Sequence, residues 1–410
     1  MCIFPIKKVK KSYLFLLMVF LGLLSQACRK GEQLALTQFA IDQTKGVYAP
    51  DKRVAIFQIT AAETAKGLVL RGATNLPEAK VALLEELGKA GIMVVDSVTV
   101  WPAAILEGKT KGVVRVSVAN IRSEPKHSSE LSTQALLGMP LRIYNRQGEW
   151  YLVQTPDDYL GWLDHGAFQS MDEAAFEAWR QTAKVIYVQD NGIALSEPDA
   201  SGKPVSDLVQ GNILEIKALS GDWAQVGFAD GRSGYVPVAA VMDFQAWINS
   251  RVPDAAHILE TAQQYMGRPY LWGGTSPKGM DCSGFTKTVF MLNGVQLPRD
   301  ASQQVQVGGE ISVDSSWTAA LPGDLLFFGR KAADDLPEKI THVGIHMGNG
   351  QFIHASGDGM VMIESLLPGS PGFNRQRLST FVRAKRVLQP DGDVAVPRLA
   401  EVPAYRELLQ

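Results

Sequence analysis

Cysteine is scarce in this chain, which has three among 410 residues: Cys2, Cys28 and Cys282. Three cysteines cannot build a disulfide framework, so a small cystine-stabilised fold is excluded. An excess of charge of either sign is also missing, because the formal net charge is −2. We therefore expect no nucleic-acid partner. With 46% hydrophobic and 20% charged residues, the composition is that of a globular chain of two to four domains.

Long apolar runs are few, and the one at the N-terminus, Tyr13–Leu24, is short for a membrane span. It follows four lysines and precedes Leu-Ser-Gln-Ala-Cys, which ends at Cys28. This pattern resembles a bacterial lipoprotein signal peptide over residues 1–28, with Cys28 as the lipidated first residue of the mature protein. A plain secretory signal and an uncleaved anchor are the alternatives. We expect an exported protein of the periplasm or cell envelope, held to a membrane by a lipid anchor.

Two segments, one near each end of the chain, are interpreted as lying outside the folded domains. Residues 29–50 are interpreted as a polar tether, and residues 389–410 as a polar, proline-rich tail. Between the tether and residue 110, alternating apolar segments surround a predicted helix, Leu76–Ala90, which has Pro77 in its first turn. Residues 51–110 are therefore predicted to form a small α/β unit.

An internal repeat occupies the middle of the chain. Gly148-Glu149-Trp150 recurs as Gly221-Asp222-Trp223, and Gly161-Trp162-Leu163 recurs as Gly234-Tyr235-Val236, always 73 residues later. Short β-rich runs between turn residues predict two small all-β barrels, over 111–170 and 184–244. We expect their tryptophans in the barrel cores, a helix over 171–183 between them, and a polar loop over 190–204. The motif pattern resembles bacterial SH3-like domains.

The segment Tyr270–Gly284, YLWGGTSPKGMDCSG, contains Cys282 in a setting that suits a nucleophile. Its glycines and proline predict a loop, and the apolar spacing after residue 284 predicts a helix. Cys282 would then lie in the first helical turn, where backbone N–H groups and the helix dipole favour a thiolate and lower the thiol pKa. The alternative is a small buried hydrophobic residue.

Three of the six histidines, His342, His346 and His354, lie in one predicted β-hairpin, residues 340–356. A three-residue loop over 348–350 would pair Gly344 with His354 and bring His342 and His354 onto one face. A two-residue loop would place them on opposite faces, and the sequence leaves this register open. The three histidines also suggest zinc, but no accompanying metal signature is present. We expect no metal and no cofactor, with His346 a surface or structural residue.

Five motifs in the order DCSGF, LPRDASQQ, PGDLLFF, HVGIHMGNG and FIHAS fall within residues 252–388. They resemble the NlpC/p60 family of papain-like cell-wall cysteine peptidases. The resemblance implies an α+β chain in which a papain-like catalytic domain follows two SH3-like barrels and a small α/β unit. It further implies Cys282 as nucleophile, His342 as general base, His354 as the residue that orients the base, and Tyr270 as a group that holds the oxyanion or substrate.

The whole arrangement resembles the γ-D-glutamyl-L-diamino acid endopeptidases of the dipeptidyl-peptidase VI type. This implies hydrolysis between D-glutamate and diaminopimelate or lysine in peptidoglycan stem peptides with a free N-terminal L-alanine. The substrate-binding residues implied by the resemblance are Asp281, Ser283, Asp300, Glu130 and Tyr159. For Asp300, capping of the following helix is the alternative. Other functions to weigh are a broader endopeptidase on intact peptidoglycan and a non-catalytic cell-wall binding protein.

Overall fold

The computed structural model describes residues 31–333, 335–388 and 395–409, which divide into two compact units on either side of residue 103. The predicted signal peptide and Cys28 lie outside the described residues. None of the helices in these ranges combines the length and apolar character that a membrane crossing needs.

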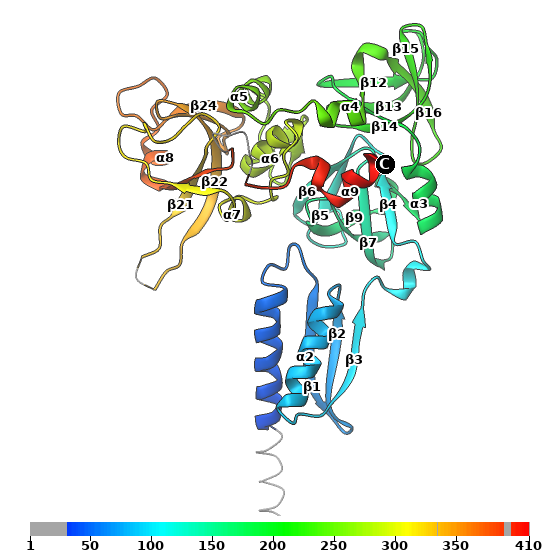
Figure 1. Ribbon diagram of the computed structural model, residues 1–410, viewed down its shortest axis with the longest axis vertical. Coiled ribbons are helices and arrows are strands. Elements are labelled where there is room, and N and C mark those ends of the chain that lie inside the picture. Colours follow the sequence, from blue (N-terminus) through cyan, green and yellow to red (C-terminus); the bar gives the residue numbers. More distant parts are fainter. Residues whose placement is uncertain (1–30, 334, 389–394, 410) are drawn as a thin grey trace, which may run out of the picture. The chain divides into compact units, whose positions relative to one another are not determined.

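The first unit is a small α/β fold, as predicted (Figure 1). A helix over 31–48 precedes an antiparallel hairpin of β1 (Phe57–Thr64) and β2 (Gly67–Thr74). Helix α2 (Pro77–Lys89) then connects β2 to β3 (Val94–Val100), which pairs with β2 in parallel. Pro77 stands in the first turn of α2, where its missing N–H has no helical partner to lose.

The expectation of a tether over 29–50 was wrong for the described part of that segment. Its helix buries Ala40 and Ile41 in one hydrophobic cluster with Leu83 and Leu87 of α2. Thr37 and Thr44 are buried on the same side, at intervals of three to four residues from the apolar pair. Half of this helical stripe is threonine, which is why the segment was interpreted as polar.

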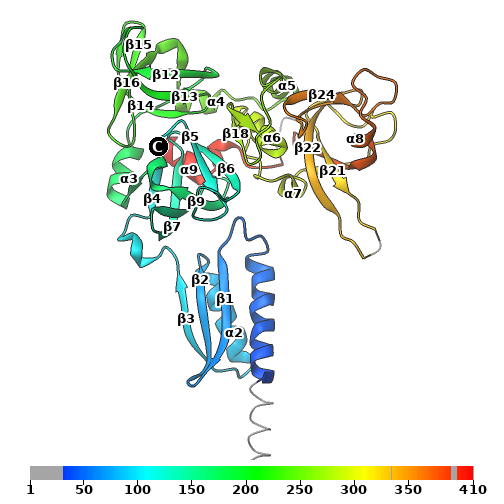
Figure 2. The same ribbon diagram turned by 180° about the vertical axis from the view of Figure 1, so that it is seen from behind.

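The second unit begins with two barrels, whose labelled strands are seen in Figures 1 and 2. Their strand orders are identical. The first barrel contains β4 (Lys111–Val114), β5 (Val118–Arg122), β6 (Leu131–Leu136), β7 (Pro140–Gln147), β8 (Trp150–Gln154), β9 (Leu160–Asp164) and β10 (Phe168–Met171). The second contains β11 (Lys184–Tyr187), β12 (Asn191–Leu195), β13 (Pro204–Val209), β14 (Ile213–Ser220), β15 (Trp223–Gly227), β16 (Ser233–Pro237) and β17 (Val241–Asp243). Each strand of the second barrel begins 73 residues after its counterpart, for example 111 and 184. The predicted repeat is therefore structural.

Two expectations about the barrels were wrong in detail. Trp150, Trp162 and Trp223 are half-buried and lie outside the cores, which consist mostly of aliphatic side chains. The segment expected as a polar loop over 190–204 contains strand β12, which pairs with β13 at one edge of the second sheet. Helix α3 (Glu173–Arg180) connects the barrels as predicted, and Asp172 caps its N-terminus.

The remaining chain forms an α+β domain around a six-stranded antiparallel sheet. After α4 (Phe244–Asn249), its helices are α5 (Ala255–Gln264), α6 (Cys282–Leu292), α7 (Ala301–Gln304) and α8 (Arg375–Thr380). A two-stranded ribbon of β18 (Thr275–Ser276) and β19 (Gly279–Met280) precedes α6. The sheet contains β20 (Gly309–Ile311), β25 (Phe381–Arg386), β21 (Leu325–Arg330), β22 (Lys339–Gly348), β23 (Gln351–Ala355) and β24 (Val361–Ser365), in that spatial order.

Alternation along the central strands separates the two faces of this sheet. Phe327, Val343 and Ile353 join the core that includes α6, whereas Phe328 and Phe352 join a second cluster. Helix α6 therefore packs on one face of the β21–β22–β23 sheet. This arrangement places the first turn of α6 next to the hairpin that contains the histidines.

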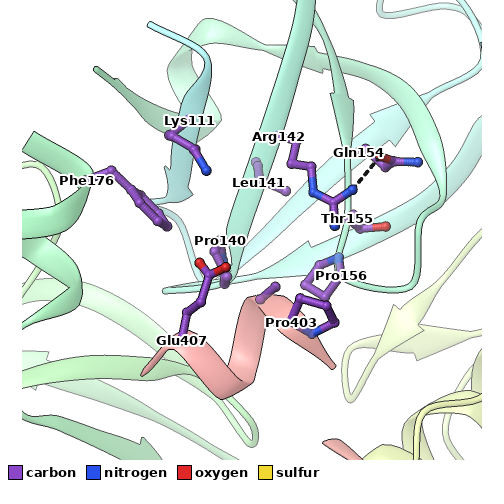
Figure 3. Close-up of a pocket in the computed structure, with 11 residues that line it drawn as sticks. Lys111, Pro140, Leu141, Arg142, Gln154, Thr155, Pro156, Phe176, Pro403 and Glu407 are labelled. Carbon is purple, nitrogen blue, oxygen red and sulfur yellow. Dashed lines mark hydrogen bonds between the residues drawn. The ribbon is translucent and has the colours of Figure 1, made fainter. Parts of the chain in front are cut away.

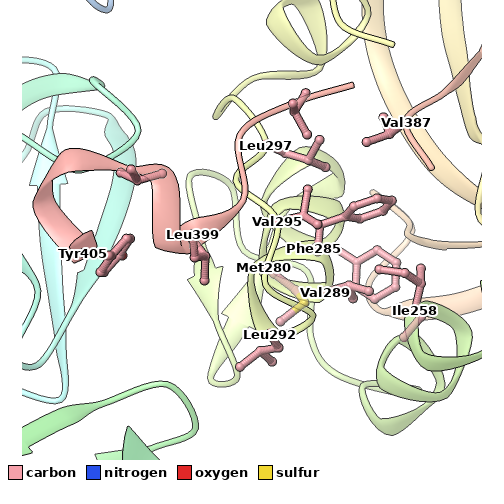
Figure 4. Close-up of a cluster of buried hydrophobic side chains, with 14 of the residues drawn as sticks. Ile258, Met280, Phe285, Val289, Leu292, Val295, Leu297, Val387, Leu399 and Tyr405 are labelled. Carbon is pink, nitrogen blue, oxygen red and sulfur yellow. The ribbon is translucent and has the colours of Figure 1, made fainter. Parts of the chain in front are cut away.

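The C-terminal segment is packed, contrary to the expectation of a polar tail. After residues 389–394, which are outside the described ranges, it forms η4 (Leu399–Glu401), α9 (Pro403–Arg406) and η5 (Glu407–Leu409). Leu399 and Tyr405 join the core that contains Leu292 of α6 (Figure 4). The same segment lines a pocket against the first barrel, opposite Lys111 and Phe176 (Figure 3).

Candidate active site

Cys282 is the first residue of α6, as predicted, and follows a loop that depends on glycine. Asp281 caps the helix by accepting a hydrogen bond from the Gly284 N–H at 2.7 Å. Gly273 has a φ of +79°, which favours glycine. A Cβ on Gly284 would lie 2.0 Å from the Gly274 carbonyl oxygen, so the helix can start here only with glycine at that position.

The thiol of Cys282 is buried, with 6% of the residue exposed. Burial is the main cause that raises its pKa to about 12, and the negative charge of Asp281 adds to this. The backbone N–H groups of Val343 and Ser283, together with Arg299, act in the opposite direction but are weaker. The predicted lowering of the thiol pKa was therefore wrong for the free site, because desolvation outweighs the helix N-terminus.

The sulfur nevertheless lies at the strand that contains the predicted base. Val343, whose N–H favours the thiolate, follows His342 directly in β22. Val343 and Cys282 also share the hydrophobic cluster between α6 and the sheet. The nucleophile and the backbone of the histidine strand are thus in contact.

The hairpin register combines the two alternatives that the sequence left open. Asn349 and Gly350 form a two-residue turn, with φ values of +51° and +70°. An irregularity between His346 and Gly348 then shifts the pairing by one residue. Gly344 consequently faces His354, and a Cβ added to Gly344 would lie 3.1 Å from the Cβ of His354.

This register brings the two predicted catalytic histidines into contact. The Nε2 atom of His342 lies 2.7 Å from Nδ1 of His354, and the rings are nearly perpendicular, at 89°. Burial lowers the pKa of both rings, most strongly that of His342. The charges of His354 and Arg377 lower the pKa of His342 further, so His342 is a neutral ring in the free site at neutral pH.

A carboxylate that the sequence did not mark stands behind His354. The Oε2 atom of Glu364, in β24, lies 3.1 Å from His354 Nε2. Asn374 donates a hydrogen bond to Glu364 Oε1 at 2.8 Å, and Arg377 Nε lies 3.7 Å from Oε2. No sequence motif pointed to Glu364, because its strand β24 was not predicted and the pairing of β24 with β23 comes only from the structure.

Arg299 forms hydrogen bonds with the residues at the start of helix α6. It is 1% exposed and donates to Asp281 through Nη2 at 2.6 Å and Nη1 at 3.1 Å. The same Nη1 lies 3.1 Å from the Ser283 hydroxyl, and Nε lies 3.1 Å from Thr133 Oγ1 of the first barrel. Asp281 and Ser283 thus hold the nucleophile helix. Their predicted contact with substrate stays a prediction.

The first barrel contributes side chains to the same region. The Tyr159 hydroxyl donates to Asp300 Oδ2 at 3.0 Å, and Trp272 Nε1 donates to Glu130 Oε1 at 2.6 Å. Asp300 is also the N-cap residue of α7, so the alternative interpretation of this residue holds as well. These contacts join Tyr159 and Glu130 of one domain to the loops around the nucleophile of the other.

The seam between the barrel and the nucleophile loop is tight. Thr275 donates from its backbone N–H to Gln134 Oε1 and from its hydroxyl to the Gln134 carbonyl, both at 3.0 Å. A Cβ on Gly273 would lie 2.1 Å from the Leu131 carbonyl oxygen. The first barrel is therefore a fixed wall beside the loop.

Tyr270 and His346 have different surroundings. Burial raises the pKa of Tyr270, and the charges of Cys282 and Asp281 add to this, so Tyr270 stands within electrostatic range of the nucleophile. His346 is fully buried, with Nδ1 3.2 Å from the Leu321 carbonyl oxygen and Nε2 accepting from the Gly350 N–H at 3.2 Å. It is structural rather than a surface residue.

Among the described residues, no group of three or more His, Cys, Asp or Glu side chains has an arrangement that could hold a metal ion.

Comparisons with known proteins agree with this architecture. The NlpC/P60 family model matches residues 267–372, and the bacterial dipeptidyl-peptidase Sh3 domain model matches residues 121–168. Dipeptidyl-peptidase 6 of Lysinibacillus sphaericus is 30% identical over 289 residues, which cover 66% of this chain and 97% of that protein. The chain belongs to the NlpC/P60 family.

Two further relatives extend the comparison. A gamma-D-glutamyl-L-lysine dipeptidyl-peptidase of Bacillus cereus is 28% identical over 244 residues, covering 56% of this chain and 68% of that protein. The crystal structure of an NlpC/P60 family protein from Bacillus cereus matches with a TM-score of 0.55 and 23% identity, over 68% of this chain and all of that one. The second comparison shows that the two proteins share a fold over that length.

The ranges matched by the family models contain the predicted site. Cys282, His342 and His354 fall within the NlpC/P60 match, as does Glu364. Glu130 and Tyr159 both fall within the Sh3 match of residues 121–168, on separate loops of the first barrel. The individual roles of these residues stay predictions of the NlpC/P60 resemblance.

Proposed function

We propose that this NlpC/P60 protein is a cysteine peptidase that hydrolyses the γ-D-glutamyl–diamino acid bond of peptidoglycan stem peptides with a free N-terminal L-alanine. The observation that carries the proposal is the contact between Tyr159 of the first barrel and Asp300 of the catalytic domain, 3.0 Å apart. It joins a barrel wall and a carboxylate beside the nucleophile loop. The name of one relative, gamma-D-glutamyl-L-lysine dipeptidyl-peptidase, supports the same kind of bond.

The chemistry starts from a neutral thiol and a neutral imidazole, because burial raises the pKa of Cys282 and lowers that of His342. As the sulfur attacks the amide carbonyl, His342 takes the thiol proton. The Cys282 backbone N–H, in the first turn of α6, and Tyr270 are the candidate donors to the oxyanion. The His342 imidazolium then protonates the leaving amine of the diamino acid, and water hydrolyses the resulting thioester.

The carboxylate of Asp300 supplies the proposed preference for a free amine. A primary ammonium of the substrate would pair with Asp300, together with the polar groups of Tyr159 and Glu130. An N-acylated stem peptide lacks this charge and would leave the carboxylate facing a neutral amide. The wall made by the first barrel also limits what can extend beyond the N-terminal residue.

The test compares L-Ala-γ-D-Glu-diaminopimelate with its N-acetylated form, using mass spectrometry of the products. We expect cleavage after D-glutamate of the free peptide and little cleavage of the acetylated one, with no activity in Cys282→Ala. Equal cleavage of both peptides would favour the broader endopeptidase. Full activity of Cys282→Ala would refute Cys282 as the nucleophile, and no cleavage of either peptide by the wild type would favour the non-catalytic cell-wall binding protein.

We also propose that the protein is an exported lipoprotein anchored through Cys28. The support is the sequence pattern of residues 1–28 alone. Cys28→Ser should move the protein from the membrane fraction to the soluble one. An unchanged membrane fraction would contradict the lipid anchor.

A further inference from the structure

Two buried polar atoms in the candidate site face each other without another hydrogen-bond partner. His354 Nε2 and Glu364 Oε2 are 3.1 Å apart, and in the described parts of the chain neither atom has another partner of this kind. His354 is fully buried, and the Glu364 side chain is 9% exposed. A buried carboxylate and a buried ring nitrogen in this arrangement stabilise each other only if the nitrogen donates a proton.

The proton position on His354 decides what its other nitrogen can do. When Nε2 carries the proton and donates to Glu364, Nδ1 is an acceptor. That acceptor faces Nε2 of His342 at 2.7 Å, so it can receive a hydrogen bond from His342. In the opposite tautomer, Nδ1 of His354 would donate, His342 would accept at Nε2, and the proton of a neutral His342 would be on its other nitrogen.

We propose that Glu364 is a positioning residue that fixes His354 in the Nε2–H tautomer and thereby orients His342 as the base. The inference rests on the proposed cysteine peptidase function and adds a fourth member to the Cys282–His342–His354 series. Glu364 acts through His354 and has no contact of its own with the reacting atoms in this scheme. A carboxylate behind a histidine has this effect on ring orientation and basicity in other sites.

The surroundings of the carboxylate make this tautomer assignment sensitive to a single substitution. Asn374 donates to Oε1, and Arg377 stands on the Oε2 side. In Glu364→Gln, the Asn374 donor would retain the amide oxygen at the Oε1 position. The amide NH₂ would then face His354 Nε2, which would have to accept and would shift the proton to Nδ1.

Glu364→Gln also removes a negative charge, and this gives the substitution a second measurable effect. Burial is the main cause that lowers the pKa of His354, and Arg377 lowers it further. Glu364 raises it through the hydrogen bond and its charge, and Asp358 raises it through charge. Loss of the Glu364 charge should therefore lower the pKa of His354, a shift that the pH dependence of its ring NMR signals measures and that a purely structural role would not require.

The experiment compares the full chain with Glu364→Gln, and with Glu310→Gln as the matched control. Glu310 also forms ion pairs, with Arg383 and Lys385, and lies on β20 at the far edge of the sheet. We expect kcat of Glu364→Gln to fall about 10- to 100-fold with KM changed less than about twofold. Glu310→Gln should match the wild type, and thermal unfolding of each variant checks the fold.

Nitrogen-15 NMR of the histidine rings tests the tautomer without any substrate. We expect the proton of His354 on Nε2 in the wild type and on Nδ1 in Glu364→Gln. Wild-type kcat together with an unchanged tautomer in Glu364→Gln would overturn the inference, even if Cys282→Ala is inactive. Activity of Cys282→Ala would instead refute the proposed function, and the NMR result would still decide the role of Glu364.

Discussion

The protonation state of the nucleophile is the most direct quantity to test. The pKa of Cys282 rises from 9.0 to about 12, a shift of about 3 units or roughly 4 kcal/mol against the thiolate. At about pH 7 the thiolate fraction is then on the order of one in 100,000, against about one in 100 for an unperturbed thiol. Alkylation of Cys282 by iodoacetamide should therefore be at least about 1000-fold slower than that of a free thiol, before its burial is counted.

The assay measures the alkylation rate of Cys282 between about pH 5 and pH 10 by peptide mass spectrometry, which separates it from Cys2 and Cys28. N-acetylcysteine in the same solution is the reference. We expect a rate that is still rising at the highest pH. A rate that reaches a plateau below about pH 7 would show a preformed thiolate–imidazolium pair and would refute the argument that desolvation dominates.

Three other predictions follow from the same geometry. Lys287→Met should lower the free energy of unfolding in urea by about 3–5 kcal/mol, because it leaves the buried Asp157 carboxylate without the ammonium group 3.1 Å away. Adding Asp157→Asn should recover part of this loss, and no recovery would contradict the pairing. Gly344→Ala should lower kcat at least about 10-fold, since its Cβ would lie 2.7 Å from a neighbouring aromatic ring, whereas Gly357→Ala, with open space around it, is the control and should retain activity. The acid limb of kcat/KM should lie below pH 6.5, because burial lowers the pKa of His342 and keeps the base form at lower pH; a limb above 6.5 would contradict this.

The sequence predicted those parts of the site that depend on local pattern. Glycines and apolar spacing predicted that Cys282 begins a helix, and strand alternation predicted the hairpin of His342 and His354. The sequence pattern could not predict the register of this hairpin, because the shift near Met347 comes from an irregularity in the strand pairing that no residue type indicates. The repeat was readable because every strand of one barrel has its counterpart at a constant offset.

Other features depend on tertiary packing and were missed for that reason. The pKa of Cys282 follows from its burial under the sheet, which local helix arguments do not contain. Glu364 reaches His354 only because β24 pairs with β23 in one particular register. The helix over 31–48 and the segment that contains Tyr405 were interpreted from their polar composition, although each has an apolar stripe that a neighbouring surface covers.

Burial shifts the pKa values of both Cys282 and His342, and in each case it favours the neutral form. It raises the pKa of Cys282 and lowers that of His342, so charge separation is unfavourable while the site has no substrate. The groups that favour the charged forms, the Val343 N–H beside the sulfur and the Glu364 carboxylate behind His354, are already in place. Their stabilisation grows as charge develops during attack on a bound carbonyl, and fixed dipoles of this kind need no reorganisation at that moment. In the proposed function, the nucleophile therefore becomes active only with a peptide in place, and the contact of Asp300 with the first barrel decides which peptides reach that position.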